Sequence, residues 1–206
     1  MALLNGGRRR LLAAALLAGA ALAACDRDDS STARPQFHAT DITGADFGRH
    51  LQLPDQNGRV RTLDDFKGKV TLLFFGYTQC PDVCPTTLAE LAQAKKDLGA
   101  EGDRIQGVFV TVDPERDTPE VLKGYVSSFD PSFVALRGSP EQTAAAAKEF
   151  KVFYAKVDGK TPGSYTMDHT AASYVLDAKG RLRLFVRYGS PAKDLEADLK
   201  TLLEAG

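Results

Sequence analysis

The spacing of apolar residues along the chain predicts alternating strands and helices from about residue 45 onward. Residues 70–75 are continuously apolar and rich in aromatic and branched side chains, which is typical of a strand covered on both faces. Residues 105–112 predict a second strand of the same kind. Between them, leucine and alanine recur at helical spacing until Gly99, a residue type that commonly ends a helix. The pattern therefore predicts an α/β core built on two buried strands.

The rest of the pattern adds further strands and helices to this core. The predicted elements are a hairpin over residues 51–63, helices from 117 to about 129 and from 139 to about 150, strands at 171–176 and 182–188, and a final helix after Pro191. Periodicity alone gives an α/β fold with a mixed sheet. The order strand–helix–strand, crossover helix, hairpin and C-terminal helix is that of a thioredoxin-like domain.

The N-terminal segment has the pattern of an export signal. Residues 1–24 place three arginines before an apolar run that ends in small residues and is shorter than the roughly 18–20 residues that cross a bilayer. The end of this run and Cys25 resemble a bacterial lipobox, so we expect Cys25 to be lipidated and to anchor the chain without spanning the membrane. Residues 25–44 are predicted to be a flexible tether, and residues 45–206 to form the globular domain.

Composition and charge narrow the possible functions. The chain is 43% hydrophobic and 26% charged, an ordinary globular balance that excludes collagen-like and disordered chains. The net charge of −1, which falls to −4 when the three arginines of the signal are removed, lacks the basic footprint of nucleic-acid binding. An exported protein works in an oxidising compartment. With Cys25 assigned to lipidation, Cys80 and Cys84 remain as one isolated pair.

Cys80 and Cys84 lie between a predicted buried strand and a predicted helix. At a helix N-terminus, backbone N–H groups and the helix dipole favour thiolate over thiol. Three residues separate the two cysteines, whereas the thioredoxin redox motif has two, and the chain contains no Trp. The wider loop lets both sulfurs converge on a ligand between them, although a disulfide remains possible. A disulfide with a purely stabilising role is disfavoured, because closing so short a loop removes little unfolded-state entropy.

A metal bound by this pair would need further ligands, and the chain has three histidines. His38 lies in the predicted tether and His50 in the predicted hairpin, so both are expected to be solvated surface residues. His169 lies in a turn-rich loop just before the predicted strand 171–176. In a thioredoxin-like sheet, the loop before this strand faces the N-terminus of the cysteine-bearing helix. Two thiolates and one imidazole form a soft site of low coordination number, which suits Cu(I) or thiolate-bound Cu(II) better than structural zinc.

Two neighbours of His169 are further candidates for the site. Asp168 could orient the imidazole ring or supply a distal oxygen, and the sequence does not decide between this role and a side chain that points away. Met167 is expected to pack in the core rather than to act as a thioether ligand.

Three segments of the chain resemble the Sco/SenC family of copper proteins that serve cytochrome c oxidase assembly. They are the segment around Cys80-Pro81-Asp82-Val83-Cys84-Pro85, residues 110–119, and Asp168-His169-Thr170, in the family's order and spacing. The resemblance covers roughly residues 45–205. It implies a thioredoxin-like fold with an added N-terminal β-hairpin, and copper bound by Cys80, Cys84 and His169. In residues 113–119 we expect a strand end, a turn and a helix cap, with Asp113 or Arg116 as alternatives for positioning the active-site loop.

The resemblance also implies partners and a location. The family delivers copper to the binuclear copper site of cytochrome c oxidase subunit II, or reduces the cysteines of that site. The expected location is the outer, periplasmic face of the bacterial cytoplasmic membrane, held by the lipid anchor. An oxidised Cys80–Cys84 pair cannot bind copper, so loading requires prior reduction by a partner. The expected further partner is a periplasmic thiol reductant or a copper donor.

Two functions of other classes remain alternatives to a copper chaperone. A thiol–disulfide oxidoreductase with incidental metal binding would use the same cysteine pair, and the sequence does not rank it against metal transfer. A peroxidase of the peroxiredoxin or glutathione-peroxidase type shares the fold, but the chain has no obvious constellation for activating peroxide.

Overall fold

The computed structural model describes residues 35–206, and residues 36–206 form one compact unit. The predicted export signal, Cys25 and most of the predicted tether lie outside the described residues. The elements in chain order are β1 (Thr40–Asp41), β2 (Gln52–Pro54), β3 (Val60–Thr62), the 3₁₀ helix η1 (Leu63–Phe66), β4 (Val70–Gly76), α2 (Val83–Asp97), the 3₁₀ helix η2 (Gly99–Arg104), β5 (Ile105–Thr111), α3 (Pro119–Ser127), β6 (Val134–Leu136), α4 (Pro140–Glu149), β7 (Tyr154–Asp158), β8 (Tyr165–His169), β9 (Ala172–Leu176), β10 (Leu182–Arg187) and α5 (Ala192–Glu204).

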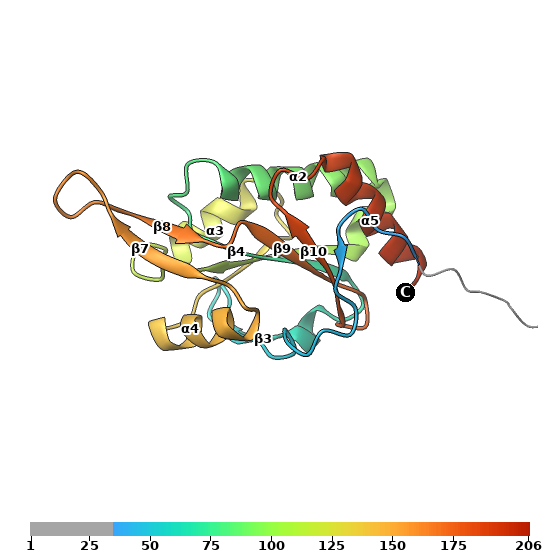
Figure 1. Cartoon of the computed structure of the whole chain (residues 1–206), viewed down its shortest axis with the longest axis horizontal. Helices are drawn as coiled ribbons and strands as arrows, with labels where there is room; N and C mark the ends of the chain where they lie inside the picture. Colours follow the sequence, from blue (N-terminus) through green and yellow to red (C-terminus); the bar gives the residue numbers. More distant parts are fainter. Residues whose placement is uncertain (1–34) are drawn as a thin grey trace, which may run out of the picture. The chain divides into compact units, whose positions relative to one another are not determined.

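A six-stranded mixed sheet organises the domain, with strand order β1-β10-β9-β4-β5-β6. Strands β4, β5 and β6 run parallel, whereas β9 pairs antiparallel with β4 and β10. All seven residues of β4 and all seven of β5 are buried, as their continuously apolar sequences predict. Helices α2 and α5 lie over one face of the sheet, and α4 lies over the other (Figure 1). This arrangement confirms the α/β, thioredoxin-like fold.

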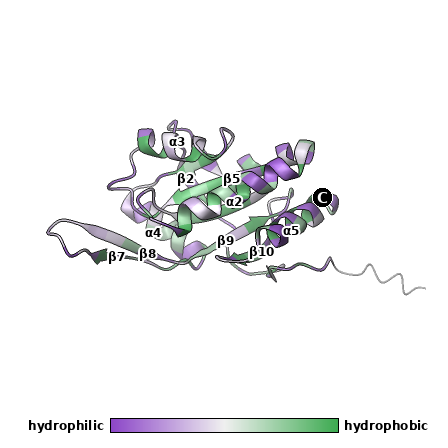
Figure 2. Cartoon of the chain, turned by 90° about the horizontal axis from the view of Figure 1, so that it is seen from above, coloured by the Kyte–Doolittle hydropathy of each residue, from purple (hydrophilic) through white to green (hydrophobic). Residues whose placement is uncertain are grey.

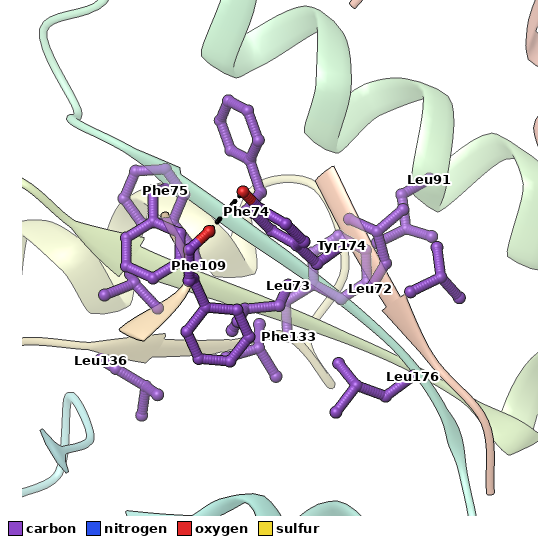
Figure 3. Close-up of a cluster of buried hydrophobic side chains, with 14 of the residues drawn as sticks. Leu72, Leu73, Phe74, Phe75, Leu91, Phe109, Phe133, Leu136, Tyr174 and Leu176 are labelled. Atoms are coloured by element: carbon purple, nitrogen blue, oxygen red, sulfur yellow. Dashed lines mark hydrogen bonds between the residues drawn. The ribbon is translucent and has the colours of Figure 1, made fainter. Parts of the chain in front are cut away.

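The core lies on both sides of β4 and β5. Leu72, Phe74 and Phe109 are at most 1% exposed, and they pack with buried side chains of neighbouring strands and of α2 (Figure 3). Figure 2 shows the hydrophobic residues gathered along these central elements, whereas the β7–β8 loop is largely hydrophilic. Among residues 35–206, no helix has both the length and the apolar character that a membrane crossing demands.

The folded domain begins before the predicted boundary at residue 45. β1 pairs with β10, and the Asp198 carboxylate of α5 accepts hydrogen bonds from the backbone N–H groups of His38 and Ala39, each at 2.8 Å. Phe37 packs against the core. Asp198 lies 160 residues beyond His38, and β10 is similarly distant along the chain, so no local periodicity in residues 36–44 reveals these contacts.

Two further features differ from the sequence-based expectation. β6 forms the edge of the main sheet but was not predicted, because it is only three residues long. Residues 154–169 form a hairpin, β7–β8, that makes a separate two-stranded sheet. The segment before the strand at 171–176 was predicted to be a loop, and this prediction is wrong for residues 165–169, which form β8.

Candidate metal centre

The two cysteines lie at the junction between the end of β4 and the start of α2. Cys84 is the second residue of α2 and is fully buried, whereas Cys80 lies in the preceding loop and is partly exposed. The backbone N–H of Cys84 donates a hydrogen bond to the Sγ of Cys80 at 3.4 Å. The two sulfurs are not joined in a disulfide. The end of the buried strand and the first turn of the helix thus place the sulfurs beside backbone N–H groups, which stabilise negative charge.

Gly76 explains how Cys84 comes so close to β4. A Cβ at this position would lie 2.7 Å from the Sγ of Cys84 and 2.9 Å from ring carbons of Phe74 and Phe109. Real Cβ contacts are never this short, so a side chain at residue 76 would displace the thiol or the aromatic rings. The glycine is therefore required by packing, because it leaves the space that the Cys84 sulfur occupies.

His169 is brought to this pair by the β7–β8 hairpin. It is the last residue of β8 and pairs with Tyr154 of β7. Its Nε2 lies 3.6 Å from the Sγ of Cys84, and one ligand atom from each of Cys80, Cys84 and His169 lies within 4.8 Å of the other two. In residues 35–206 this is the one group of three or more His, Cys, Asp or Glu side chains arranged so that it could hold a metal ion.

Three contacts orient the imidazole ring of His169. Its Nδ1 lies 3.2 Å from the carbonyl oxygen of Thr170. A carbonyl can only accept, so this contact favours a proton on Nδ1, and Nε2 is the ring nitrogen that faces the sulfurs. The rings of Phe74 and Tyr77 approach the imidazole edge-on, with centroids 5.8 and 5.9 Å away. The nitrogen that could bind a metal thus points toward the two thiols.

The two cysteines share one negative charge in the reduced state. A hydrogen bond from the Cys84 thiol lowers the pKa of Cys80 to about 4, with further help from the backbone N–H groups of Asp82 and Cys84. The same hydrogen bond and burial raise the pKa of Cys84 above its ordinary value. Cys80 is therefore a thiolate at neutral pH, and Cys84 keeps its proton until a positive charge or a bond to a metal replaces it.

The other candidate residues from the sequence lie away from the sulfurs. His38 is bound to Asp198 and His50 is exposed beside α4, so neither takes part in the cluster. Met167 is buried in the core, as expected. Asp168 is exposed, and strand alternation turns it to the opposite face of β8 from His169. Of the two alternatives for Asp168, the structure therefore favours the one in which its side chain points away from the site.

One group of site residues was only partly anticipated by the sequence. Thr118 caps α3 by accepting the N–H of Val121, as a strand end, turn and cap over residues 113–119 predict. Asp117, however, is fully buried and accepts hydrogen bonds from the Thr78 hydroxyl at 2.6 Å and from the Thr78 backbone N–H at 3.1 Å. Burial raises the pKa of this carboxyl. Asp117 thus fixes the loop that leads to Cys80, through a contact across 39 residues that leaves no local pattern.

Comparison with known proteins places the chain among relatives that are similar along most of its length. Residues 39–204 match the family model described as SCO1/SenC. The chain is 41% identical over 152 residues to an SCO2-like protein of Rickettsia felis, an alignment that covers 73% of this chain and 74% of the relative.

Solved structures are similar as well. The copper-bound structure of ScoI from Bradyrhizobium japonicum superposes with a TM-score of 0.68 at 45% identity, covering 75% of this chain and 98% of that one. A SCO1/SenC family lipoprotein from Bacillus anthracis gives a TM-score of 0.63 at 29% identity, covering 74% of this chain and 92% of that one.

Proposed function

Because the chain belongs to the SCO1/SenC family, we propose that it binds copper and serves the assembly of cytochrome c oxidase. The observation that carries this proposal is the convergence of two sulfurs and one imidazole nitrogen within 4.8 Å of one another. In the related ScoI of Bradyrhizobium japonicum, copper is bound. We assign Cys80, Cys84 and His169 as the copper ligands in this chain.

The chemistry of the three side chains suits copper as a cargo. Thiolate and imidazole are soft donors, and three protein ligands satisfy Cu(I) without a fourth. Cys80 is already a thiolate, so loading requires only that Cys84 release its proton when its sulfur binds the ion. The partial exposure of Cys80 leaves one ligand open to solvent. An acceptor with its own cysteines could therefore take the ion through a shared-thiolate intermediate.

We propose that the acceptor is the binuclear copper site of cytochrome c oxidase subunit II. The test is anaerobic incubation of the copper-loaded domain with the reduced, metal-free soluble domain of subunit II, followed by separation and copper analysis of each protein. Copper should move to subunit II in the wild type and with Asp168→Asn, a matched control because Asp168 lies next to His169 but on the opposite face of β8. If copper stays on the loaded protein at equilibrium, direct delivery is contradicted.

A second candidate function uses the same pair for thiol–disulfide exchange. The low pKa of Cys80 and its partial exposure favour attack on an external disulfide, and Cys84 lies close enough to resolve the product. In this reaction the Cys80 thiolate attacks the acceptor's disulfide, which breaks that S–S bond and forms a mixed disulfide. The Cys84 sulfur then loses its proton to the departing thiolates and bonds to Cys80, which breaks the mixed disulfide and releases the acceptor as a dithiol. A periplasmic thiol reductant must afterwards return two electrons to the Cys80–Cys84 disulfide.

The two functions respond differently to loss of His169. The exchange reaction needs only the sulfurs, so His169→Ala should still reduce a disulfide-bonded subunit II peptide at a rate close to that of the wild type. Copper transfer should fail in the same variant. Equal loss of both activities would show that the functions cannot be separated at this histidine.

We propose that lipid on Cys25 holds the protein on the outer face of the bacterial cytoplasmic membrane. The support is the lipobox pattern before Cys25 and the similarity to a SCO1/SenC family lipoprotein of Bacillus anthracis. The substitution Cys25→Ser should move the protein from the membrane fraction to the soluble periplasmic fraction. The measured mass of the protein should no longer include the lipid. Membrane association that survives this change would contradict the anchor.

A further inference from the structure

Arg116 connects the loop that carries Cys80 with the hairpin that carries His169. Its Nη1 donates to the side-chain oxygen of Gln79 at 3.1 Å and to the backbone carbonyl of Tyr165 at 2.9 Å. Gln79 directly precedes Cys80, and Tyr165 is the first residue of β8. One guanidinium group therefore bridges the two segments that supply the proposed ligands.

Further contacts hold this guanidinium in place. Its Nε donates to the carboxylate of Asp113, which is 3% exposed and also accepts the hydroxyl of Tyr165 at 2.9 Å. The guanidinium carbon lies 3.6 Å from the ring centroid of Tyr165 and 5.7 Å from that of Tyr77. The second of these rings contacts His169 edge-on. Arg116 thus packs against two aromatic rings, one of which, that of Tyr77, contacts the imidazole.

The hairpin is attached to the rest of the fold by side-chain packing, with Met167, Tyr154 and Tyr165 against the core, rather than by strand pairing. β7 and β8 pair only with each other and do not join the six-stranded sheet. Two-stranded hairpins are marginally stable on their own in water. On the outward side, Phe153 just before β7 is 64% exposed and Val157 is 40% exposed. The position of His169 relative to the sulfurs therefore depends on side-chain contacts, among which the Arg116 bridge spans both segments.

We infer that Arg116 is a positioning residue of the metal centre, which holds the β7–β8 hairpin against the cysteine loop and keeps His169 within ligand range of the sulfurs. The inference rests on the proposed copper-binding function. Arg116 does not touch the ion in this scheme. It acts by raising the fraction of reduced, metal-free molecules in which all three ligands are assembled, and the apparent affinity for copper rises in proportion to that fraction.

A double-mutant cycle on copper affinity tests this inference. Copper affinities are measured by anaerobic competition with a Cu(I) chelator for the wild type, Arg116→Gln, His169→Ala and the double variant. Loss of a group that orients a metal ligand typically weakens binding by about 10–100-fold, so we expect at least about a tenfold loss in Arg116→Gln. In the His169→Ala background the same change should alter affinity by less than about twofold, because the ligand that Arg116 positions is gone.

Lys156→Gln supplies the matched control. The Lys156 ammonium also lies over the ring of Tyr165, at 3.8 Å, and pairs with the exposed Glu115. It makes no contact with the cysteine loop in the hydrogen bonds and ion pairs of residues 35–206. The substitution Lys156→Gln therefore removes a positive charge from the face of the Tyr165 ring and leaves the Arg116 bridge intact. We expect it to leave copper affinity within about twofold of the wild type.

Tyr165→Phe keeps the test valid if Arg116→Gln does not fold, which thermal unfolding would reveal. This change removes one hydroxyl and its bond to Asp113, and it should weaken copper binding only when His169 is present. Equal losses with and without His169, wild-type affinity in Arg116→Gln, or an equal loss in Lys156→Gln would each overturn the positioning role. Unchanged affinity in His169→Ala alone would instead overturn the ligand set on which the proposed function rests.

Discussion

The proposed ligands come from two regions that the fold supports in different ways. Cys80 and Cys84 follow β4, whose seven residues are all buried and which pairs with both β5 and β9. His169 comes from the β7–β8 hairpin, which pairs only with itself, and among the ten residues of its two strands Met167 alone is buried. The sulfurs are therefore held by the stability of the whole domain, whereas the imidazole is held by local contacts.

This difference separates effects on folding from effects on metal binding. A substitution in the core around β4 should lower the free energy of unfolding and also displace both cysteine sulfurs. A substitution on the hairpin should change the position of His169 while the rest of the domain keeps its stability, since local openings need far less free energy than global unfolding.

The largest expected effect is in the shared core beneath the cysteines. Phe109 is fully buried on β5, opposite Phe74 of β4, with ring centroids 6.2 Å apart. Replacement Phe109→Ala removes the ring and leaves a cavity, so we expect a loss of about 3–5 kcal/mol in the free energy of unfolding. Urea unfolding followed by circular dichroism measures this change. A loss below about 1 kcal/mol would show that these strands do not dominate the stability.

A smaller effect is expected at the close approach between β4 and α2. Gly76→Ala should lower the free energy of unfolding by about 1–3 kcal/mol, because the new methyl group meets the Cys84 sulfur and two aromatic rings. It should also weaken copper binding by moving the sulfur. Gly124→Ala in α3 is the matched control, because its Cβ would meet nothing within 4 Å and alanine favours a helix. If both variants have the same stability, the packing argument for Gly76 is wrong.

The shared thiolate predicts how stability depends on pH in the reduced, metal-free domain. The folded protein keeps Cys80 ionised down to about pH 4, whereas an unfolded thiol holds its proton up to about pH 8.5. Folding therefore releases a proton in this window, and this group's contribution to stability should rise with pH across it and be lost as the pH falls toward 4. The measurement is the urea midpoint at pH 5 and pH 7 in the wild type and in Cys80→Ser.

The difference between the two proteins isolates the contribution of the cysteine pair from that of other titrating groups. The rise from pH 5 to pH 7 should be smaller in Cys80→Ser. An identical rise in both proteins would contradict the assignment of a low pKa to Cys80.

The smallest effect is expected on the outer side of the hairpin. Val157 is 40% exposed, so Val157→Ser should change the free energy of unfolding by less than about 0.5 kcal/mol. Urea unfolding under the conditions used for Phe109→Ala makes the two regions directly comparable. A loss of more than about 2 kcal/mol would mean that the hairpin belongs to the cooperative core, and the contrast between the regions would fail.

The same contrast explains which parts of the structure could be predicted from the sequence. Strands β4 and β5 were predicted because burial on both faces requires a continuous run of apolar residues. Helix α2 was predicted because burial of one face requires apolar residues at helical spacing. The hairpin was missed because its strands are half exposed, and Lys156, Asp158 and Asp168 interrupt any apolar alternation. Gly163 and its neighbours instead resemble a loop.

The candidate site could be predicted only in part for a related reason. Cys80, Cys84 and His169 were selected by residue type and by the fold in which they lie, and the structure brings the three together. The contacts of Arg116 with Gln79 and Tyr165 span 37 and 49 residues. Such contacts depend on the tertiary arrangement and leave no signal at fixed spacing, so the sequence offered Arg116 only as an alternative.

Anaerobic copper titration of the reduced domain, combined with X-ray absorption of the loaded protein, tests the central claim most directly. We predict one copper ion per chain with two sulfur neighbours and one nitrogen neighbour. The loss of affinity in His169→Ala should exceed the about 10–100-fold typical for loss of an outer-shell partner, and the nitrogen signal should disappear. Wild-type affinity in His169→Ala, or an ion with sulfur neighbours alone in the wild type, would contradict the three-residue copper site.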